Sequence, residues 1–340
     1  MVNAESEPST PKPSAFEPAA QYERLLHDGS LPMPIAAVTV LAEVIERSQS
    51  STMQELLDEI SRVASDLRRE AHNPVSLSAG TALLLRFVTL QRPPPTLSFD
   101  AHKRALARLA RDFVRRAPEL AILIANEAAK FVNDGSTIMT HGFSRVVTKT
   151  LIHAANVHRK RFNVLVCESR PFGLGVKTHA VLSKAGIPCT IILDSAVAYS
   201  MGRVTAVFLG AEGVAESGGL ISGIGSFQMA LAAKHFGKQV YALVESYKFL
   251  RIYPLSQSDL PTITDPLTRV ATEKEQEAAA TAPILPTPSR PMRASPMPKA
   301  LEMTQAQIDD NPLLDFTSPD LISMIISDVA IVRLAIRLGH

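Results

Sequence analysis

The first third of the chain has the apolar spacing of amphipathic helices. Within residues 52–70, large aliphatic residues recur at intervals of three and four positions, which places them on one face of a helix. These residues are Leu56, Ile60, Val63 and Leu67. Thr52 and Glu55 stand at the spacing of a capping box, in which each side chain accepts a hydrogen bond from the other residue's backbone N–H. The pattern predicts a helix from about Thr52 to Glu70.

Three further stretches of this region continue the helical pattern, namely residues 34–47, 78–91 and 99–131. The second stretch is apolar on nearly every side, which is typical of a buried helix. The third should break near Pro118, because proline lacks the N–H group that a helix interior requires. Together these patterns predict a helical domain over residues 21–132.

Two stretches lack the large apolar side chains that form a core. Residues 1–20 are rich in Pro, Ser, Glu and Ala, and residues 268–303 carry a dense run of prolines between Pro283 and Pro298. Such segments bury too little surface to offset the entropy that is lost on ordering. We predict a disordered tail over residues 1–20 and a disordered insertion at about 268–303, because the apolar pattern resumes at Asn311.

From Gly135 onward the pattern changes to short apolar runs. These runs, at 136–141, 163–169, 188–194, 206–212 and 239–246, are separated by amphipathic stretches that begin near Ser144, Gly175, Ser195 and Ser226. Unbroken apolar strands that alternate with helices are typical of a parallel sheet covered on both faces. The sequence therefore predicts the α/β class, with an N-terminal helical domain followed by an open parallel-sheet domain over residues 133–340.

Composition and charge narrow the possible functions. The chain has 340 residues, of which 46% are hydrophobic, so it can fill a sizeable core. Its 35 Lys and Arg residues nearly balance its 33 Asp and Glu residues, so we expect no direct binding of nucleic acid. Residues 1–20 contain no apolar segment of the kind found in secretory signals, and the sequence has no apolar run of membrane-spanning length. We therefore expect a cytoplasmic protein with no membrane partner.

The two cysteines indicate neither a disulfide framework nor a metal site. Neither Cys167 nor Cys189 belongs to a cluster of Cys and His at zinc-binding spacing. Cys167 lies within an apolar run, which favours a buried thiol over a nucleophile. We expect no metal and no required cofactor.

Polar residues follow the apolar runs at the points where the predicted strands end. Ligands of such sheets bind outside the carboxyl ends of the strands, so these side chains form the candidate ligand crevice. The candidate residues are His141, Glu168, Ser169, Arg170, Asp194, Glu212, Glu245, Ser246 and Lys248, with Ser144 and Ser226 at the helix starts that follow. For any single residue, the alternative is that strands simply end at a polar surface.

A glycine-rich turn before the last of these helices is a candidate anion site. The first N–H groups of a helix have no partner within the helix and carry partial positive charge. The residues of the turn are Gly223, Gly225 and Ser226. Arg170 and Lys248 add cationic groups, so we expect a sugar phosphate or a nucleotide monophosphate as ligand. The alternative is that these cations pair with the carboxylates of Glu168 and Glu245.

The segment after the insertion has too many large aliphatic residues to form a surface that is exposed to solvent. It covers residues 315–329 and reads DFTSPDLISMIISDV. We expect a second copy of the chain to cover it through an isologous interface, which makes the protein a homodimer. The alternative is that the segment completes the core of its own chain.

Seven segments carry the motifs of a known protein family in the order in which that family has them. They are NPVSLSAGTALLLRF (73–87), DGSTIMTHGFSRVV (134–147), FNVLVCESRP (162–171), TIILDSAVAYSM (190–201), VFLGAEGVAESGGLISGIGSFQMALAAK (207–234), YALVESYKFLRIYPL (241–255) and DFTSPDLISMIISDVA (315–330). These segments closely resemble the alpha/beta/delta family of eukaryotic translation initiation factor 2B, and its alpha branch in particular.

The resemblance implies a helical N-terminal domain and a Rossmann-like C-terminal domain. It also implies a noncatalytic regulatory subunit of the guanine-nucleotide exchange factor for translation initiation factor 2. The implied partners are a second copy of the chain, the beta, gamma, delta and epsilon subunits that the homodimer bridges, and the phosphorylated alpha subunit of initiation factor 2. Arg68 and Arg69 in the helical domain are candidates for contacting that partner, because phosphoserine binds arginine donors.

The same family is similar to the ribose-1,5-bisphosphate and methylthioribose-1-phosphate isomerases, which use a catalytic Cys and a catalytic Asp. By this resemblance the Cys falls on Gly142 and the Asp falls on Glu212. Glycine offers no acid, base or nucleophile, so we expect no isomerase activity. The alternative hypotheses are a sugar-phosphate isomerase of the ribose-1,5-bisphosphate type and a free-standing sugar-phosphate sensor.

Overall fold

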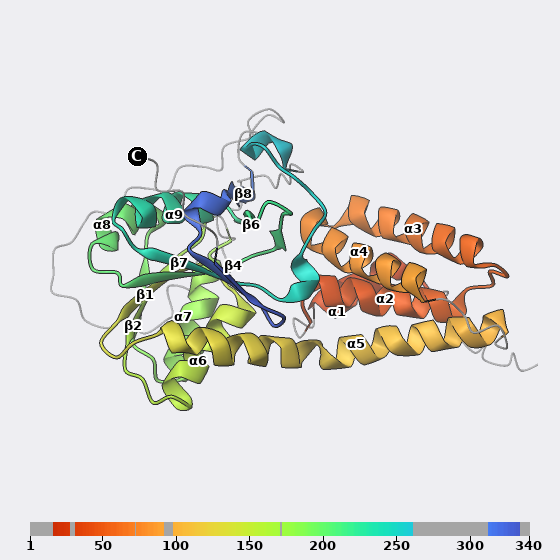
Figure 1. Cartoon of the computed structure of the whole chain (residues 1–340), viewed down its shortest axis with the longest axis horizontal. Helices are drawn as coiled ribbons and strands as arrows, with labels where there is room; N and C mark the ends of the chain where they lie inside the picture. Colours follow the sequence, from red (N-terminus) through yellow and green to blue (C-terminus); the bar gives the residue numbers. More distant parts are fainter. Residues whose placement is uncertain are drawn as a thin grey trace, which may run out of the picture. The chain divides into compact units, whose positions relative to one another are not determined.

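A computed structural model describes residues 16–27, 31–71, 73–91, 98–170, 172–260 and 312–333 (Figure 1). The chain forms two compact units, which are described separately. One holds the described residues up to Ala71 together with Gly80–Arg115, and the other holds residues 73–79 and those from Arg116 onward. The insertion expected at 268–303 and residues 1–15 of the expected tail lie outside the described residues.

The first unit is built from helices, as the apolar spacing predicts. They are α1 (Pro18–His27), α2 (Met33–Arg47), α3 (Met53–Glu70), the greater part of α4 (Pro74–Leu90) and the first part of α5 (Phe99–Ala128). The expected capping box opens α3: the Glu55 N–H donates to Thr52 Oγ1 at 3.2 Å, and the Thr52 N–H donates to Glu55 Oε2 at 3.3 Å. Helix α1 starts at Pro18, within the stretch expected as a tail, and buries Tyr22.

Helix α5 runs unbroken through Pro118, so the break expected there is wrong. Proline removes only one hydrogen bond of the helical ladder, and the neighbouring residues Ala117 and Ala121 are held by burial. From Arg116 onward the helix belongs to the second unit, where Ile124 joins the core beneath the sheet. Residues 116–132, assigned above to the helical domain, therefore lie in the unit that holds the sheet.

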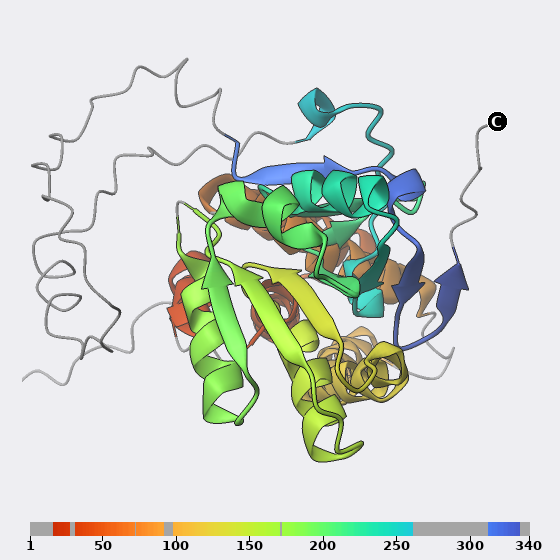
Figure 2. The same ribbon diagram turned by 90° about the vertical axis from the view of Figure 1, so that its left-hand side faces the viewer.

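The second unit is centred on a seven-stranded sheet in the order β10-β9-β7-β4-β1-β2-β3 (Figure 2). Its strands are β1 (Thr137–His141), β2 (Asn163–Cys167), β3 (Cys189–Ile192), β4 (Ala206–Gly210), β7 (Gln239–Leu243), β9 (Met324–Ile326) and β10 (Ile331–Arg333). Neighbouring strands are parallel, except that β9 and β10 are antiparallel. The apolar runs identified in the sequence form β1, β2, β3, β4 and β7, which confirms the predicted sheet.

Helices cover both faces of this sheet. The end of α5 with α6 (Arg145–Asn156) and α7 (Leu174–Lys184) covers one face, and α8 (Val197–Met201) with α9 (Ser226–His235) covers the other. Successive side chains of β1 point to opposite faces, so Ile138 enters one core and Met139 enters the other. A strand buried on both sides needs apolar residues at successive positions, which is why these runs are unbroken.

A small antiparallel sheet joins β5 (Gly213–Val214), β6 (Leu220–Gly223) and β8 (Leu314–Thr317). Strands β8 and β9 come from the segment at 315–329 that a second copy of the chain was expected to cover. Instead Phe316, Ile322 and Ile326 are buried within the same chain, as in the alternative. Short 3-10 turns occur at Ala129–Phe131, Asp194–Ala196, Ser246–Lys248, Gln257–Asp259 and Pro319–Leu321.

Candidate functional site

Strand β1 lies where the chain reverses its direction across the sheet. It pairs with β2 on one side and with β4 on the other, so the chain leaves β1 toward one edge and later returns to build the other. Open parallel sheets bind ligands in the crevice outside the carboxyl ends of the strands at such a point. His141 ends β1 and Gly210 ends β4, and these two residues mark the candidate site.

Asp194 follows β3 and binds the backbone that follows β2, beside the candidate site. Its carboxylate accepts hydrogen bonds from the backbone N–H groups of Ser169 at 2.9 Å and of Arg170 at 2.8 Å. Nε2 of His141 lies 3.9 Å from Asp194 Oδ1, and the His141 side chain is only 4% exposed. Burial lowers the pKa of His141 although the Asp194 carboxylate acts in the opposite direction, so the imidazole is neutral at physiological pH.

The N-terminus of α9 already holds a carboxylate of the same chain. The N–H groups of Gly225 and Phe227 donate to Asp315 Oδ2 at 2.7 and 2.9 Å. These amides are the ones that the sequence offers to a phosphate, so Asp315 occupies the expected anion site. Burial raises the pKa of Asp315 to about 7, against backbone hydrogen bonds that favour the charged form. Within the turn, the Ser226 hydroxyl donates to the Gly223 carbonyl oxygen at 2.8 Å.

Two buried polar atoms beside this turn lack a hydrogen-bond partner among the described residues, namely His141 Nε2 and Asp315 Oδ1. Gly225 lies next to both residues: a Cβ built on it would lie 2.7 Å from His141 Nε2, and its N–H binds Asp315. A buried polar group without a partner costs free energy. The pair therefore calls for a hydrogen-bonding ligand, and hydroxyl groups fit because they both donate and accept.

The two cations expected to bind phosphate are paired within the chain. Arg170 Nε lies 3.4 Å from Glu168 Oε2, and Lys248 Nζ lies 3.1 Å from Glu245 Oε2. Lys248 also donates to the Ala211 carbonyl oxygen at 2.8 Å. Burial alone would raise the pKa of Glu245, but the Lys248 ammonium holds it below its usual range. The Arg170 side chain is 72% exposed, so its pairing is weak and it stays accessible to an anion.

Two other candidate residues have partners that stabilise the fold. Glu212 Oε2 accepts a hydrogen bond from Ser76 Oγ in the first turn of α4, at 2.5 Å. Ser144 Oγ caps α6 by accepting from the Val147 N–H at 3.4 Å. Glu212 is therefore held by a hydroxyl group.

Sequence reasoning missed two carboxylates, Asp315 and Asp328, which both lie beyond the insertion. Asp328 accepts hydrogen bonds from the Ser246 N–H at 2.7 Å and from the Ser246 hydroxyl at 2.8 Å. The candidate residue Ser246 therefore binds a carboxylate of its own chain. One signal was available, because Asp315 stands inside the apolar run LLDF and is buried. An acid within a buried strand needs donors. Only the fold shows that those donors are the first amides of α9.

Gly142 stands where the resemblance to the isomerases places a catalytic cysteine. Its φ of +56° lies in the left-handed region, which side chains rarely adopt. A Cβ there would lie 3.1 Å from Ser169 Oγ, and Thr178 Oγ1 donates to the Gly142 carbonyl oxygen at 2.6 Å. The nearby Cys167 is no substitute nucleophile, because burial raises its pKa to about 12.

The described residues include no group of three or more His, Cys, Asp and Glu side chains arranged to hold a metal ion. Cys167 and Cys189 are both free thiols. Among the helices in the described ranges, none is both long enough and apolar enough to cross a membrane.

Comparison with known proteins finds relatives along almost the whole chain. The profile of the initiation factor 2 subunit family matches residues 26–333. Translation initiation factor eIF2B subunit alpha of Dictyostelium discoideum is 32% identical over 314 residues, which cover 92% of this chain and 91% of that protein. The ribose 1,5-bisphosphate isomerase of Archaeoglobus fulgidus is 32% identical over 209 residues, which cover 61% of this chain and 64% of the isomerase.

The fold also has close counterparts among solved structures. A chain of the tetrameric eIF2B-beta2-delta2 complex from C. thermophilum has a TM-score of 0.68 and 18% identity, covering 93% of this chain and 92% of that chain. At this identity the likeness shows the shared fold alone. That fold is a helical N-terminal region followed by a mostly parallel, Rossmann-like sheet.

Proposed function

The chain belongs to the initiation factor 2 subunit family, and we propose that it is a noncatalytic regulatory subunit of the guanine-nucleotide exchange factor for translation initiation factor 2. The observation that carries this proposal is the 32% identity to an alpha subunit along nearly the full length of both chains. The likeness to the isomerase reaches only 61% of this chain. Its place of action is the cytoplasm, together with the beta, gamma, delta and epsilon subunits.

The absence of catalysis follows from two positions at the sheet edge. Gly142 supplies no nucleophile, and its left-handed backbone disfavours a residue that would. Glu212 is hydrogen-bonded to Ser76, and a single carboxylate cannot replace an acid and a base acting together. A sugar-phosphate isomerase remains the alternative function, favoured by the similarity to the Archaeoglobus fulgidus protein. Turnover of a sugar phosphate separates the two functions.

We assign the homodimer contact to the edge strand β3 in place of the buried segment at 315–329. An edge strand presents unpaired backbone groups, and β3 also carries exposed apolar side chains. Ile191 in β3 is 37% exposed, Leu193 directly after it is 60% exposed, and Val176 on the adjoining α7 is 55% exposed. A second copy of the chain would cover this apolar edge through an isologous interface.

Light scattering tests the dimer. We expect twice the chain mass of 36.8 kDa at micromolar concentration. Leu193→Glu should shift the protein to the monomer, because a charge is costly to bury in an apolar contact. Val157→Glu is the matched control, since Val157 is 61% exposed at the end of α6 and lies outside this edge. A monomeric wild-type protein, or equal dissociation in both variants, would contradict the contact.

The phosphorylated alpha subunit of initiation factor 2 is the regulatory partner in this proposal. Arg68 and Arg69 lie in the last turn of α3, where cations also complement the helix dipole. Arg69 pairs with Asp66 on the same helix, and both side chains are largely exposed. An exposed pair of this kind is weak, so the guanidinium can exchange its carboxylate for a phosphoserine.

The sheet edge where β1 and β4 end is the proposed ligand site, for a sugar phosphate or a nucleotide monophosphate. Its support is the pair of unpartnered buried atoms, His141 Nε2 and Asp315 Oδ1, and the exposed guanidinium of Arg170. Calorimetry with a panel of these ligands should give heat that disappears in Arg170→Ala, whereas Arg159→Ala, in the loop between α6 and β2, should bind normally. Silence across the panel at millimolar ligand would rule the site out.

A further inference from the structure

Lys177 is an exposed cation beside the proposed ligand site. It lies in the first turn of α7, directly before Thr178, whose hydroxyl donates to the Gly142 carbonyl oxygen at 2.6 Å. Its Nζ lies 4.5 Å from the centroid of the Phe143 ring. Within the part of the chain that the structure describes, Lys177 forms no ion pair, whereas both cations that the sequence predicts as phosphate ligands are paired with carboxylates.

The Phe143 ring holds this ammonium group where strand β1 ends. A lysine ammonium over the face of an aromatic ring is attracted to it when the centroid lies within about 6 Å. Phe143 is half-buried and stands two residues after His141, the last residue of β1. The ring carries no charge that could neutralise the ammonium. Lys177 is therefore positioned at the sheet edge and is still available to an anion.

Backbone contacts fix the start of α7 at the same edge. The Gly175 N–H donates to the Glu168 carbonyl oxygen at 3.0 Å, and a Cβ on Gly175 would collide with the Cys167 carbonyl oxygen at the end of β2. Only glycine allows so close an approach of helix and strand. The first turn of α7, with Lys177, is thus held against the end of β2, where the loop that carries Arg170 begins.

The charges at this edge favour an anionic ligand. Helices α6 and α7 follow the neighbouring parallel strands β1 and β2, so both begin here, and neither has an acidic residue in its first turn. The N-terminus of a helix carries partial positive charge, which disfavours a basic residue. Each helix nevertheless has one there, namely Arg145 in α6 and Lys177 in α7. A bound anion would offset this unfavourable arrangement.

The neighbouring carboxylates already have partners. Asp194 accepts hydrogen bonds from two backbone N–H groups at 2.9 and 2.8 Å, and Glu168 lies beside the Arg170 guanidinium. Neither carboxylate forms an ion pair with Lys177. The buried Nε2 of His141, which lacks a hydrogen-bond partner among the described residues, independently indicates a ligand at this edge.

We propose that Lys177 binds the phosphate group of the ligand and that Phe143 is its positioning residue, an inference that rests on the ligand site proposed above. An ammonium group forms strong charge-assisted hydrogen bonds with phosphate oxygens, and the exposed Arg170 guanidinium adds a planar pair of donors. His141 Nε2 then remains for a hydroxyl group of the same ligand. The ligand class is a phosphate monoester that carries hydroxyl groups and is bound through both.

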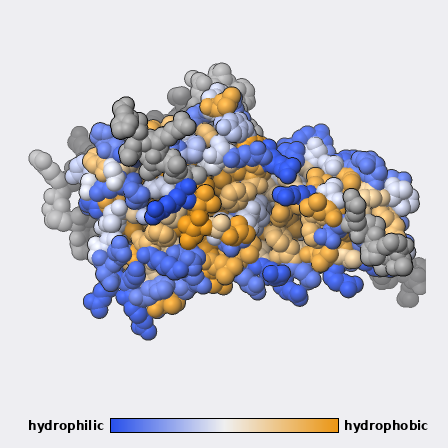
Figure 3. All heavy atoms as spheres, viewed as in Figure 1, coloured by the Kyte–Doolittle hydropathy of each residue, from blue (hydrophilic) through white to orange (hydrophobic). Residues whose placement is uncertain are grey.

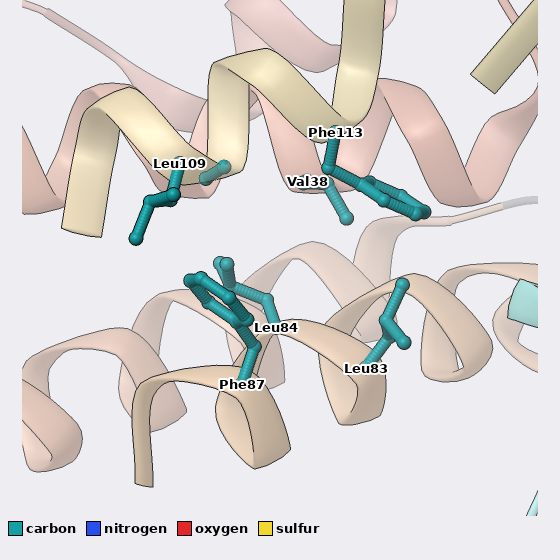
Figure 4. A pocket seen from close by; sticks show the side chains of 7 residues that line it. Val38, Leu83, Leu84, Phe87, Leu109 and Phe113 are labelled. Atoms are coloured by element: carbon teal, nitrogen blue, oxygen red, sulfur yellow. The ribbon is translucent and has the colours of Figure 1, made fainter. Parts of the chain in front are cut away.

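An apolar cavity in the helical unit differs from this site in its chemistry. Figure 4 shows Leu83 and Phe87 of α4 facing Leu109 and Phe113 of α5 across it. Every residue that lines the cavity is apolar, and Figure 3 shows apolar residues, in orange, on the face of the helical unit that carries α4 and α5. Such a lining offers no charged group to a phosphate. Leu109→Ala should therefore leave phosphate binding unchanged.

The test is calorimetry on the full-length protein with ribose 5-phosphate, glucose 6-phosphate and AMP as probes. Lys177→Ala should weaken the binding of each probe that the wild type binds by about tenfold or more, because a charge-assisted contact is lost. Lys177→Arg should keep the affinity within about threefold, because it keeps the charge. Phe143→Leu should weaken binding about threefold or more and Phe143→Tyr should not, because either aromatic ring attracts the ammonium.

Lys184→Ala is the matched control, because Lys184 is an exposed lysine in the last turn of the same helix. A measurement without substitutions supports the test: a bound probe should slow the acetylation of Lys177 by acetic anhydride, followed by mass spectrometry, but not that of Lys184. Equal loss of binding in Lys184→Ala, or acetylation of Lys177 at an unchanged rate, would overturn the proposal. Full binding by Phe143→Leu would overturn the positioning role of Phe143.

Arg170→Ala separates this inference from the proposed ligand site. Loss of binding in Arg170→Ala together with unchanged binding in Lys177→Ala would overturn the role of Lys177 and leave the ligand site standing. No binding of any probe to the wild type at millimolar concentration would overturn both.

Discussion

Asp315 holds the start of helix α9 through Gly225, whose N–H donates to Asp315 Oδ2 at 2.7 Å. The carboxylate comes from β8, ninety positions further along the chain, so the contact ties the end of the fold to its centre. It also places an acidic side chain at the positive end of the helix dipole. Asp315 of the same chain thus occupies the helix start that the sequence predicts as a phosphate site.

The pH dependence of stability should reveal this carboxyl group. Burial raises the pKa of Asp315 from 3.8 to about 7, so the folded protein binds the proton more tightly than the unfolded chain does. The resulting stabilisation is complete below pH 3.8 and is lost as the pH rises through about 7. Asp315→Asn keeps an acceptor for both amides but does not titrate.

We therefore expect the free energy of unfolding of the wild type to fall relative to Asp315→Asn across this window. The fall should be at most about 1.4 kcal/mol per pH unit. Urea unfolding of both proteins at several pH values measures it. Parallel profiles for the two proteins would show that Asp315 titrates normally in the folded state.

Gly225 and Gly223 offer a matched pair of glycines in one turn. Gly225 has a φ of +103°, and a Cβ on it would lie 2.7 Å from His141 Nε2, whereas a Cβ on Gly223 meets nothing within 4 Å. Gly225→Ala should therefore destabilise the protein by about 1–3 kcal/mol. Gly223→Ala should change stability by about 0.5 kcal/mol at most. Thermal unfolding checks the difference, and equal effects would contradict the strained geometry.

Local patterns predicted most of the fold. The capping box at Thr52 and the unbroken apolar runs identified α3 and five strands of the main sheet, because these signals lie within a few residues of one another. The pairing of β9 with β7 was not predicted from the sequence, because it joins segments on either side of the long insertion. At Pro118 the sequence pattern was misleading, because the burial of Ala117 and Ala121 outweighs one lost hydrogen bond of the helix.

The candidate site was less predictable than the fold. Sequence position correctly placed His141, Ser169, Arg170 and Asp194 at one edge, because parallel strands end on the same side of a sheet. The partners of the remaining polar residues depend on side-chain geometry. Lys248 pairs with Glu245 and donates to the Ala211 carbonyl oxygen. No pattern in the sequence distinguishes a lysine paired in this way from a lysine that is available to bind a phosphate.

Introducing the catalytic residues of the isomerases should not create catalysis. Gly142→Cys places a side chain on a left-handed backbone, and Glu212→Asp shortens a carboxylate that now reaches Ser76. We expect neither the wild type nor the double variant to turn over ribose-1,5-bisphosphate or methylthioribose-1-phosphate, because the reacting groups would be misplaced. A spectroscopic product assay checks this. Turnover on the order of 1 per second or faster by the wild type would favour the isomerase function.

Charge reversal at the end of α3 should weaken regulation. In the assembled exchange factor, we expect Arg68→Glu with Arg69→Glu to reduce severalfold the inhibition of nucleotide exchange by phosphorylated initiation factor 2, because a carboxylate repels a phosphoserine. Exchange on the unphosphorylated factor should not change. Arg24→Glu, in the last turn of α1, is the control. An unchanged response in the double variant would move the sensing surface elsewhere.

Assembly tests the central claim most directly, namely that the chain is a regulatory subunit of the exchange factor. The measurement is native mass spectrometry of the chain co-expressed with the beta, gamma, delta and epsilon subunits from the same source. We predict one complex in which two copies of this chain join two copies of each of the other four subunits, and Leu193→Glu should split it into halves. Recovery of the chain free of all four subunits, while those subunits assemble with one another, would contradict the claim.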